Sequence, residues 1–210
     1  MKATLRKAAV LALFAAVLTG GSAPRTVLSE QERDDLVRVS AYLNSISTLK
    51  GGFIQVGPDG QLDQGMFYLK KPGRLRFEYA APNPNLIVAD GQSIAVENKE
   101  LKTTDRYPLV STPLDIILQN NVDMTRDANV VAVERRAGAL MITAREDSGP
   151  AEGEIMLVFA DPGLELRQWV VVDAQGLRTT VVLRDMLKDV ELDPKMFVIQ
   201  EHNRFKKFDY

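Results

Sequence analysis

The sequence predicts a mainly β protein with few helices, in which one antiparallel sheet curls into a barrel or half-barrel. After Lys50 the hydrophobic pattern changes to a period of two. Turn signals rich in proline, glycine and aspartate recur at intervals of about 10 residues, which is typical of strands joined by hairpins. The chain has 210 residues, 45% of them hydrophobic and 26% charged, so it is long enough to bury one core.

The N-terminal residues 1–23 resemble a secretory signal peptide. Lys2, Arg6 and Lys7 precede a short apolar run, and small residues follow as far as Ala23. The apolar run is shorter than the roughly 20 residues of a membrane-spanning helix. We therefore expect cleavage near Ala23 and a single domain over residues 24–210. Residues 1–23 hold three of the 26 basic residues and none of the 28 acidic ones, so the remainder carries a net charge of −5. This charge argues against nucleic-acid binding.

One helix is predicted over residues 29–46. Ser29 and Glu32 have the spacing of a capping box, which marks a helix start. Leu36, Val39 and Leu43 then recur at three- and four-residue steps and form one narrow apolar stripe. A second, short helix is predicted near residues 112–119, with Thr112 as its N-cap and a proline in its first turn.

Two series of strands are predicted on either side of the short helix. The first series comprises 52–57, 65–71, 74–80, 85–89, 93–97 and 101–106. The second comprises 128–136, 139–146, 153–160, 164–173, 176–184 and 196–200. No linker, repeat or low-complexity stretch divides the chain, which supports one domain.

Residue types that carry chemistry are scarce. The chain has no cysteine and one histidine, His202, which excludes disulfides, thiolate metal sites and cysteine nucleophiles. No phosphate-binding loop, dinucleotide fingerprint or paired metal-ligand spacing is present. We expect a protein that is not an enzyme and needs no cofactor or metal.

The segment from Gly65 to Pro82 is the most informative part of the sequence. Phe67 and Leu69 share one face of the first strand, and Met66 and Tyr68 make its opposite face apolar as well. A sheet that is apolar on both faces must be covered on both or must hold a ligand.

The order of motifs resembles the LolA family of periplasmic outer-membrane lipoprotein carriers. The resemblance includes the first helix, a Phe-x-Gln strand at Phe53, and the hairpin from Gly65 to Pro72. It continues through Arg-Phe-x-Tyr-x-x-Pro at 76–82, Leu-Ile-Val-x-Asp-Gly at 86–91, the short mid-chain helix and Asp-Pro-x-x-Phe at 193–197. It implies an incomplete, strongly curved antiparallel barrel, with helices as a lid over its concave apolar face.

The function implied by the resemblance is transport without chemistry. The concave face would receive the acyl chains of lipoproteins in the periplasm. An inner-membrane ATP-driven transporter would load the carrier, which acts as a monomer and delivers its cargo to an outer-membrane receptor.

The candidate site residues form three groups. The cavity lining is predicted to comprise Phe53, Phe67, Leu69, Leu75, Phe77, Tyr79, Leu86 and Val88. The lid is predicted to comprise Leu36, Val39, Leu43, Leu114, Ile117 and Leu118. The family often has an arginine before the turn proline, where it is implicated in lid closure and cargo release. This chain has Lys71 there, which can donate to lid carbonyls but lacks the planar fork of arginine.

Two alternatives remain open at this point. A regulatory lipid or lipoprotein sensor could use the same half-barrel, although such sensors usually carry a second domain. A small outer-membrane barrel is the other, because Phe208 and Tyr210 alternate at the C-terminus. The amphipathic first helix is foreign to such barrels.

Overall fold

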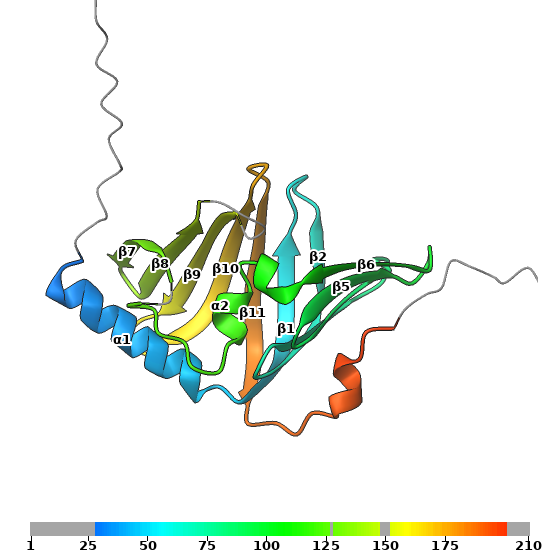
Figure 1. The fold of residues 1–210 in the computed structure, drawn as a ribbon, viewed down its shortest axis with the longest axis horizontal. Coiled ribbons are helices and arrows are strands. Elements are labelled where there is room, and N and C mark those ends of the chain that lie inside the picture. Colours follow the sequence, from blue (N-terminus) through cyan, green and yellow to red (C-terminus); the bar gives the residue numbers. More distant parts are fainter. Residues whose placement is uncertain (1–27, 127, 148–151, 201–210) are drawn as a thin grey trace, which may run out of the picture.

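Eleven strands form a single antiparallel sheet in the computed structural model, which describes residues 28–126, 128–147 and 152–200 (Figure 1). The strand order is β6-β5-β4-β3-β2-β1-β11-β10-β9-β8-β7. Within the described residues the end strands β6 and β7 do not pair, so the curved sheet stays open as a half-barrel. The predicted fold class is confirmed.

The element bounds agree closely with eleven of the twelve predicted strands. The first six strands are β1 (Thr48–Val56), β2 (Leu62–Lys70), β3 (Arg74–Tyr79), β4 (Asn85–Asp90), β5 (Ser93–Asn98) and β6 (Thr103–Pro108). The other five are β7 (Val130–Arg136), β8 (Ala139–Glu146), β9 (Gly153–Ala160), β10 (Glu165–Asp173) and β11 (Arg178–Lys188). The helices are α1 (Glu30–Ser45), η1 (Leu109–Ser111), α2 (Asp115–Leu118) and η2 (Pro194–Phe197), where η marks a 3-10 helix.

Helix α1 begins as the capping box predicts. The Ser29 hydroxyl accepts a hydrogen bond from the Glu32 amide at 3.3 Å, and the Ser29 amide donates to the Glu32 carboxylate at 2.7 Å. These two bonds satisfy amide groups that have no partner within the helix. The stripe of Leu36, Val39 and Leu43 is buried against the sheet.

Two local predictions were wrong. Thr112 does not cap α2, because its hydroxyl donates to the Leu109 carbonyl and the helix starts after Leu114 without a side-chain cap. The strand predicted at 196–200 is replaced by η2. The Asp193 carboxylate accepts from the Lys195 amide at 2.9 Å, and Pro194 occupies the first turn, so this segment forms a capped helical turn.

The topology explains why α2 lies over the sheet. Strand β1 is central and pairs with both β2 and β11, so the two series extend to opposite edges. The segment between β6 and β7 must therefore cross from one edge of the sheet to the other. It crosses on the side that α1 also covers, and it carries η1 and α2 (Figure 1). The core lies between these helices and the concave face.

The predicted signal peptide, residues 1–23, lies outside the described residues, as do His202, Phe208 and Tyr210. Among the described residues, no helix has the length and apolar character needed to cross a membrane.

Candidate functional site

Five of the predicted cavity residues lie on the concave face and are buried there. They are Phe53, Phe67, Leu69, Leu75 and Phe77. The strand register brings them together, since Phe67 pairs with Phe77 and Leu69 pairs with Leu75 between β2 and β3. Paired residues of neighbouring strands project to the same side of a sheet, so these side chains form one continuous apolar surface.

Aromatic rings form the centre of this surface. The Phe77 ring centroid lies 4.6 Å from that of Phe53, 5.9 Å from that of Phe67 and 6.0 Å from that of Trp169. Tyr79 is half-buried beside Phe53, and its hydroxyl donates to the Gln55 side-chain oxygen at 2.9 Å. Burial raises the pKa of Tyr79 to about 12.

Trp169 was missed by the sequence analysis. It joins the surface because β10 and β11 return to pair beside β1, which places residues from opposite ends of the chain on one face. Alternation from Leu164 and Leu166 would place Trp169 on the opposite face, but the pairing register shifts between Leu166 and Gln168, and this irregularity brings Trp169 to the buried side.

Leu86 and Val88 do not face the cavity, which corrects the prediction. Leu86 pairs with Glu78 and Val88 pairs with Arg76, so both project from the opposite face of the sheet. Ile87 occupies the inward position on β4 instead, opposite Phe77. A strand that is apolar on both faces leaves this choice to the pairing register.

The far face near β4 is covered by the segment that follows β11. Helix η2 contacts β3 and β4, and the Arg76 guanidinium donates to the Met196 carbonyl at 2.9 Å. The Lys70 ammonium lies 3.5 Å from the Leu192 carbonyl. This cover explains why Leu86 and Val88 are buried although they face away from the helices.

The predicted lid residues pack on the concave face. Leu36, Val39, Leu43, Ile117 and Leu118 are buried in the core, and Leu114 is half-buried against it. Leu43 and Ile117 line a small inner cavity together with residues of the sheet, among them Phe67, Leu75 and Trp169. Its volume of about 10 Å³ leaves room for one water molecule at most. In this closed structure the helices fill the space under them.

Both helices are bonded to the turn between β2 and β3. The Lys71 ammonium donates to the Leu43 carbonyl, in the last turn of α1, at 2.9 Å. The backbone amide of Gly73 donates to the Leu118 carbonyl, at the end of α2, also at 2.9 Å. Carbonyls at two helix ends thus find donors in one hairpin turn, and the Leu43 carbonyl also accepts from the Ile46 amide at 3.3 Å.

Lys71 is an unusual donor because it is nearly enclosed. Its exposed fraction is 9%, and burial lowers its pKa from 10.5 to about 8. The cause is desolvation, which disfavours the charged ammonium.

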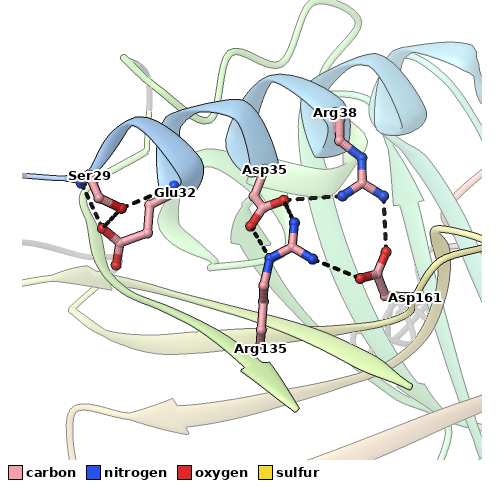
Figure 2. A network of polar contacts seen from close by, with 6 residues as sticks. All are labelled: Ser29, Glu32, Asp35, Arg38, Arg135 and Asp161. Carbon is pink, nitrogen blue, oxygen red and sulfur yellow. Dashed lines mark hydrogen bonds and ion pairs between the residues drawn. The ribbon is translucent and has the colours of Figure 1, made fainter. Parts of the chain in front are cut away.

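An ion-pair network, which the sequence analysis missed, anchors the first half of α1 (Figure 2). Asp35 is 1% exposed and contacts Arg38 on the same helix at 3.1 Å. Arg135 of β7 holds Asp35 with two nitrogens, of which Nε lies 2.8 Å from Oδ2. Asp161, in the turn after β9, accepts from Arg38 at 2.9 Å and from Arg135 at 3.0 Å. The network joins three segments that are distant in the sequence.

The second half of α1 is bonded to the loop after α2. The Ser40 hydroxyl donates to the Leu36 carbonyl at 2.7 Å and accepts from the Met124 amide at 2.9 Å. The Asn44 amide side chain makes two bonds with the Val122 backbone, at 2.8 and 2.9 Å. Helix α1 therefore has polar contacts along its whole length.

Comparisons with known proteins found a matching family model, several relatives and solved structures of similar fold. A model of the family described as "Outer membrane lipoprotein carrier protein LolA" matches residues 44–200. An outer-membrane lipoprotein carrier protein from Alkalilimnicola ehrlichii is 29% identical over 83% of this chain and 83% of its own length. One from Cupriavidus pinatubonensis is 28% identical over 90% and 89%. A crystal structure of a LolA superfamily protein from Nitrosomonas europaea aligns with 78% of this chain and 97% of its own, with 12% identity and a TM-score of 0.43.

Proposed function

Since this chain belongs to the LolA family of outer-membrane lipoprotein carrier proteins, we propose that it carries lipoproteins through the periplasm by holding their acyl chains. The acyl chains would lie between the concave apolar face and helices α1 and α2. The observation that carries this proposal is the pairing of a continuous aromatic and aliphatic surface with two covering helices whose own apolar residues fill the space.

The closed state supplies a reason why cargo can both bind and leave. Each methylene that leaves water contributes about 0.8 kcal/mol, so acyl chains favour the apolar surface strongly. Leu43 and Ile117 occupy that surface when no cargo is present. Cargo must displace them, and their return on closure offsets part of the cargo's binding energy. Such competition favours a carrier that releases its cargo over one that traps it.

Lys71 is the proposed release residue. A hydrogen bond from a charged donor contributes about 1.5–3 kcal/mol, which favours the closed state. The fall in the pKa of Lys71 from 10.5 to about 8 corresponds to an opposing desolvation cost of about 3 kcal/mol. The bond favours closure while enclosure of the ammonium opposes it, so the closed state is stabilised only in part and can reopen.

The wider pathway follows the family. Residues 1–23 would direct export and be removed, which leaves one domain in the periplasm. An inner-membrane ATP-driven transporter would supply the lipoprotein and an outer-membrane receptor would accept it. A monomer without cofactor suffices, because binding and release involve no bond chemistry.

The proposal is tested by purifying the periplasmic form and identifying any bound acylated protein by mass spectrometry. Binding of a palmitoylated fluorescent peptide in solution gives a second measurement. Phe67→Asn should weaken this binding at least about tenfold, because it places a polar group on the cavity face. Met66→Asn is the matched control, since Met66 is the adjacent residue of β2, is 42% exposed and projects to the other side. Wild-type protein that binds neither lipoprotein nor peptide would refute the carrier function.

A further inference from the structure

Three polar side chains lie together at one end of the concave apolar surface. This Gln55 group comprises Gln55 of β1, Asp63 of β2 and Tyr79 of β3, each of which is half-buried. Gln55 pairs with Asp63 in one neighbouring strand and with Val181 in the other, and Val181 belongs to the hydrophobic core. Because paired residues of neighbouring strands project to the same side of a sheet, Gln55 and Asp63 both face the concave side.

The Gln55 group lies at a distance from the Lys71 turn that suits one acyl chain. Gln55 and Leu49 share one face of β1, and Leu49 pairs with Leu69 close to that turn. A strand rises about 3.3 Å per residue, so roughly 20 Å of apolar surface separates Gln55 from Leu49. The two leaflets of a bilayer share a hydrocarbon core about 30 Å thick, so one acyl chain spans about 15 Å. A chain whose polar end lies at Gln55 therefore ends before the turn.

A hydrogen bond within the Gln55 group fixes the orientation of the amide. The Tyr79 hydroxyl donates to Gln55 Oε1 at 2.9 Å, and the Tyr79 ring packs on Phe53 with 5.2 Å between the ring centroids. Burial raises the pKa of Tyr79 to about 12, so its hydroxyl keeps the proton that it donates. With Oε1 engaged, the NH2 group of Gln55 is left for a ligand. In the part of the chain that the structure describes, no group accepts from that NH2 or donates to the Asp63 carboxylate.

These two groups select the chemistry of the ligand. An acyl chain ends in a carbonyl carbon, whose oxygen accepts hydrogen bonds, and the amide NH2 is a donor of the matching kind. The Asp63 carboxylate accepts from neutral N–H or O–H groups but repels a second carboxylate, whose charge has the same sign. Together they suit an acyl chain in an ester or amide linkage and disfavour a free fatty acid.

We propose that Gln55 binds the carbonyl oxygen of an ester- or amide-linked acyl chain, with Tyr79 as the residue that positions its amide and Asp63 as the residue that excludes free fatty acids. The inference rests on the proposed carrier function and assigns its ligand class. It also sets the direction of the cargo. The polar end of the lipoprotein lies at the Gln55 group, and the acyl chains extend toward the Lys71 turn.

Competition against a bound palmitoylated fluorescent peptide tests the carbonyl contact. The competitors are monopalmitoylglycerol and the hexadecyl ether of glycerol, which are both neutral, have chains of equal length and differ by the carbonyl oxygen. Wild-type protein should bind the ester about fivefold more tightly than the ether, the ratio expected from one hydrogen bond. Gln55→Leu should bind the two alike. Gln64→Leu is the matched control on the opposite face of β2 and should keep the wild-type preference.

Infrared spectroscopy of the bound ester reports the contact directly. The stretching band of an isotope-labelled carbonyl should lie at lower frequency on wild-type protein than on Gln55→Leu, because a hydrogen bond weakens the carbonyl double bond. Tyr79→Phe should give a band between the two, since the amide of Gln55 remains but loses its positioning bond. A packing role of Tyr79 alone would leave the band unchanged. Asp63→Asn should bind palmitate at least about threefold more tightly than wild type and bind the ester equally well.

Equal binding of ester and ether by wild-type protein would overturn the carbonyl contact while the carrier function stands. This comparison requires no substitution, so it decides the question even when a variant fails to fold. A Gln55→Leu protein that keeps the preference, or an Asp63→Asn protein that binds palmitate no better than wild type, would overturn the role given to that residue. If wild-type protein binds neither the peptide nor the ester, the carrier function fails, and the contact that rests on it fails too.

Discussion

The buried ammonium of Lys71 predicts a specific dependence of stability on pH. Its pKa is about 8 in the folded protein and about 10.5 when exposed to water in the unfolded chain. Between these values the unfolded state binds more protons than the folded state. The free energy of unfolding should therefore rise as the pH increases through this window, and it should lose the same amount as the pH falls back to 8.

The size of the effect follows from the shift in the pKa of Lys71. One pKa unit corresponds to about 1.4 kcal/mol, so the Lys71 contribution should reach about 3 kcal/mol by pH 10.5. Below pH 8 the ammonium is protonated in both states and contributes no slope. Lys71→Met removes the titrating group while keeping a long, unbranched side chain.

The assay is urea unfolding of wild type and Lys71→Met at intervals from pH 7 to pH 10.5. The difference between the two free energies isolates Lys71, because other groups are present in both proteins. Tyr79, whose raised pKa of about 12 lowers stability above pH 10, cancels in this way. A difference that stays flat, or that falls between pH 8 and 10.5, would refute the enclosure of Lys71 as the cause.

Other changes test release, anchoring and packing. Lys71→Leu should leave loading intact and trap loaded carrier in the periplasm, while Lys71→Arg should preserve transfer, as measured by the share of lipoprotein that reaches the outer membrane. Asp35→Ala should lower the free energy of unfolding, measured in urea, by about 1–3 kcal/mol, because two arginines lose a buried partner. In the control Glu134→Ala, which removes an exposed ion pair, the free energy of unfolding should fall by less than about 1 kcal/mol. Gly65→Ala should lower the free energy of unfolding by about 3 kcal/mol or more, because the added Cβ would lie 1.9 Å from the backbone oxygen of Glu78. In the control Gly163→Ala the added Cβ meets no atom within 4 Å, so the melting temperature should stay unchanged.

Several features of this protein are local and can be predicted from the sequence. The capping box at Ser29 and Glu32 depends on two residues three positions apart. The hairpin of β2 and β3 is predicted by the alternation of apolar and polar residues in the two strands and by the Pro72-Gly73 turn between them. The apolar stripe of α1 follows from helical spacing. In each case the interacting groups are close in the chain, so their geometry depends little on the rest of the fold.

Tertiary structure decided which residues form the site. Both faces of β4 are apolar, so only its pairing with β3 determined that Ile87 faces the cavity and Val88 does not. Arg135 meets Asp35 across 100 positions of sequence because β7 lies at the sheet edge beside α1. The lowered pKa of Lys71 arises from enclosure by elements that are separate in the sequence. Local pattern sets which segments become strands and helices, but side-chain contacts, burial and charge depend on which segments the topology brings together.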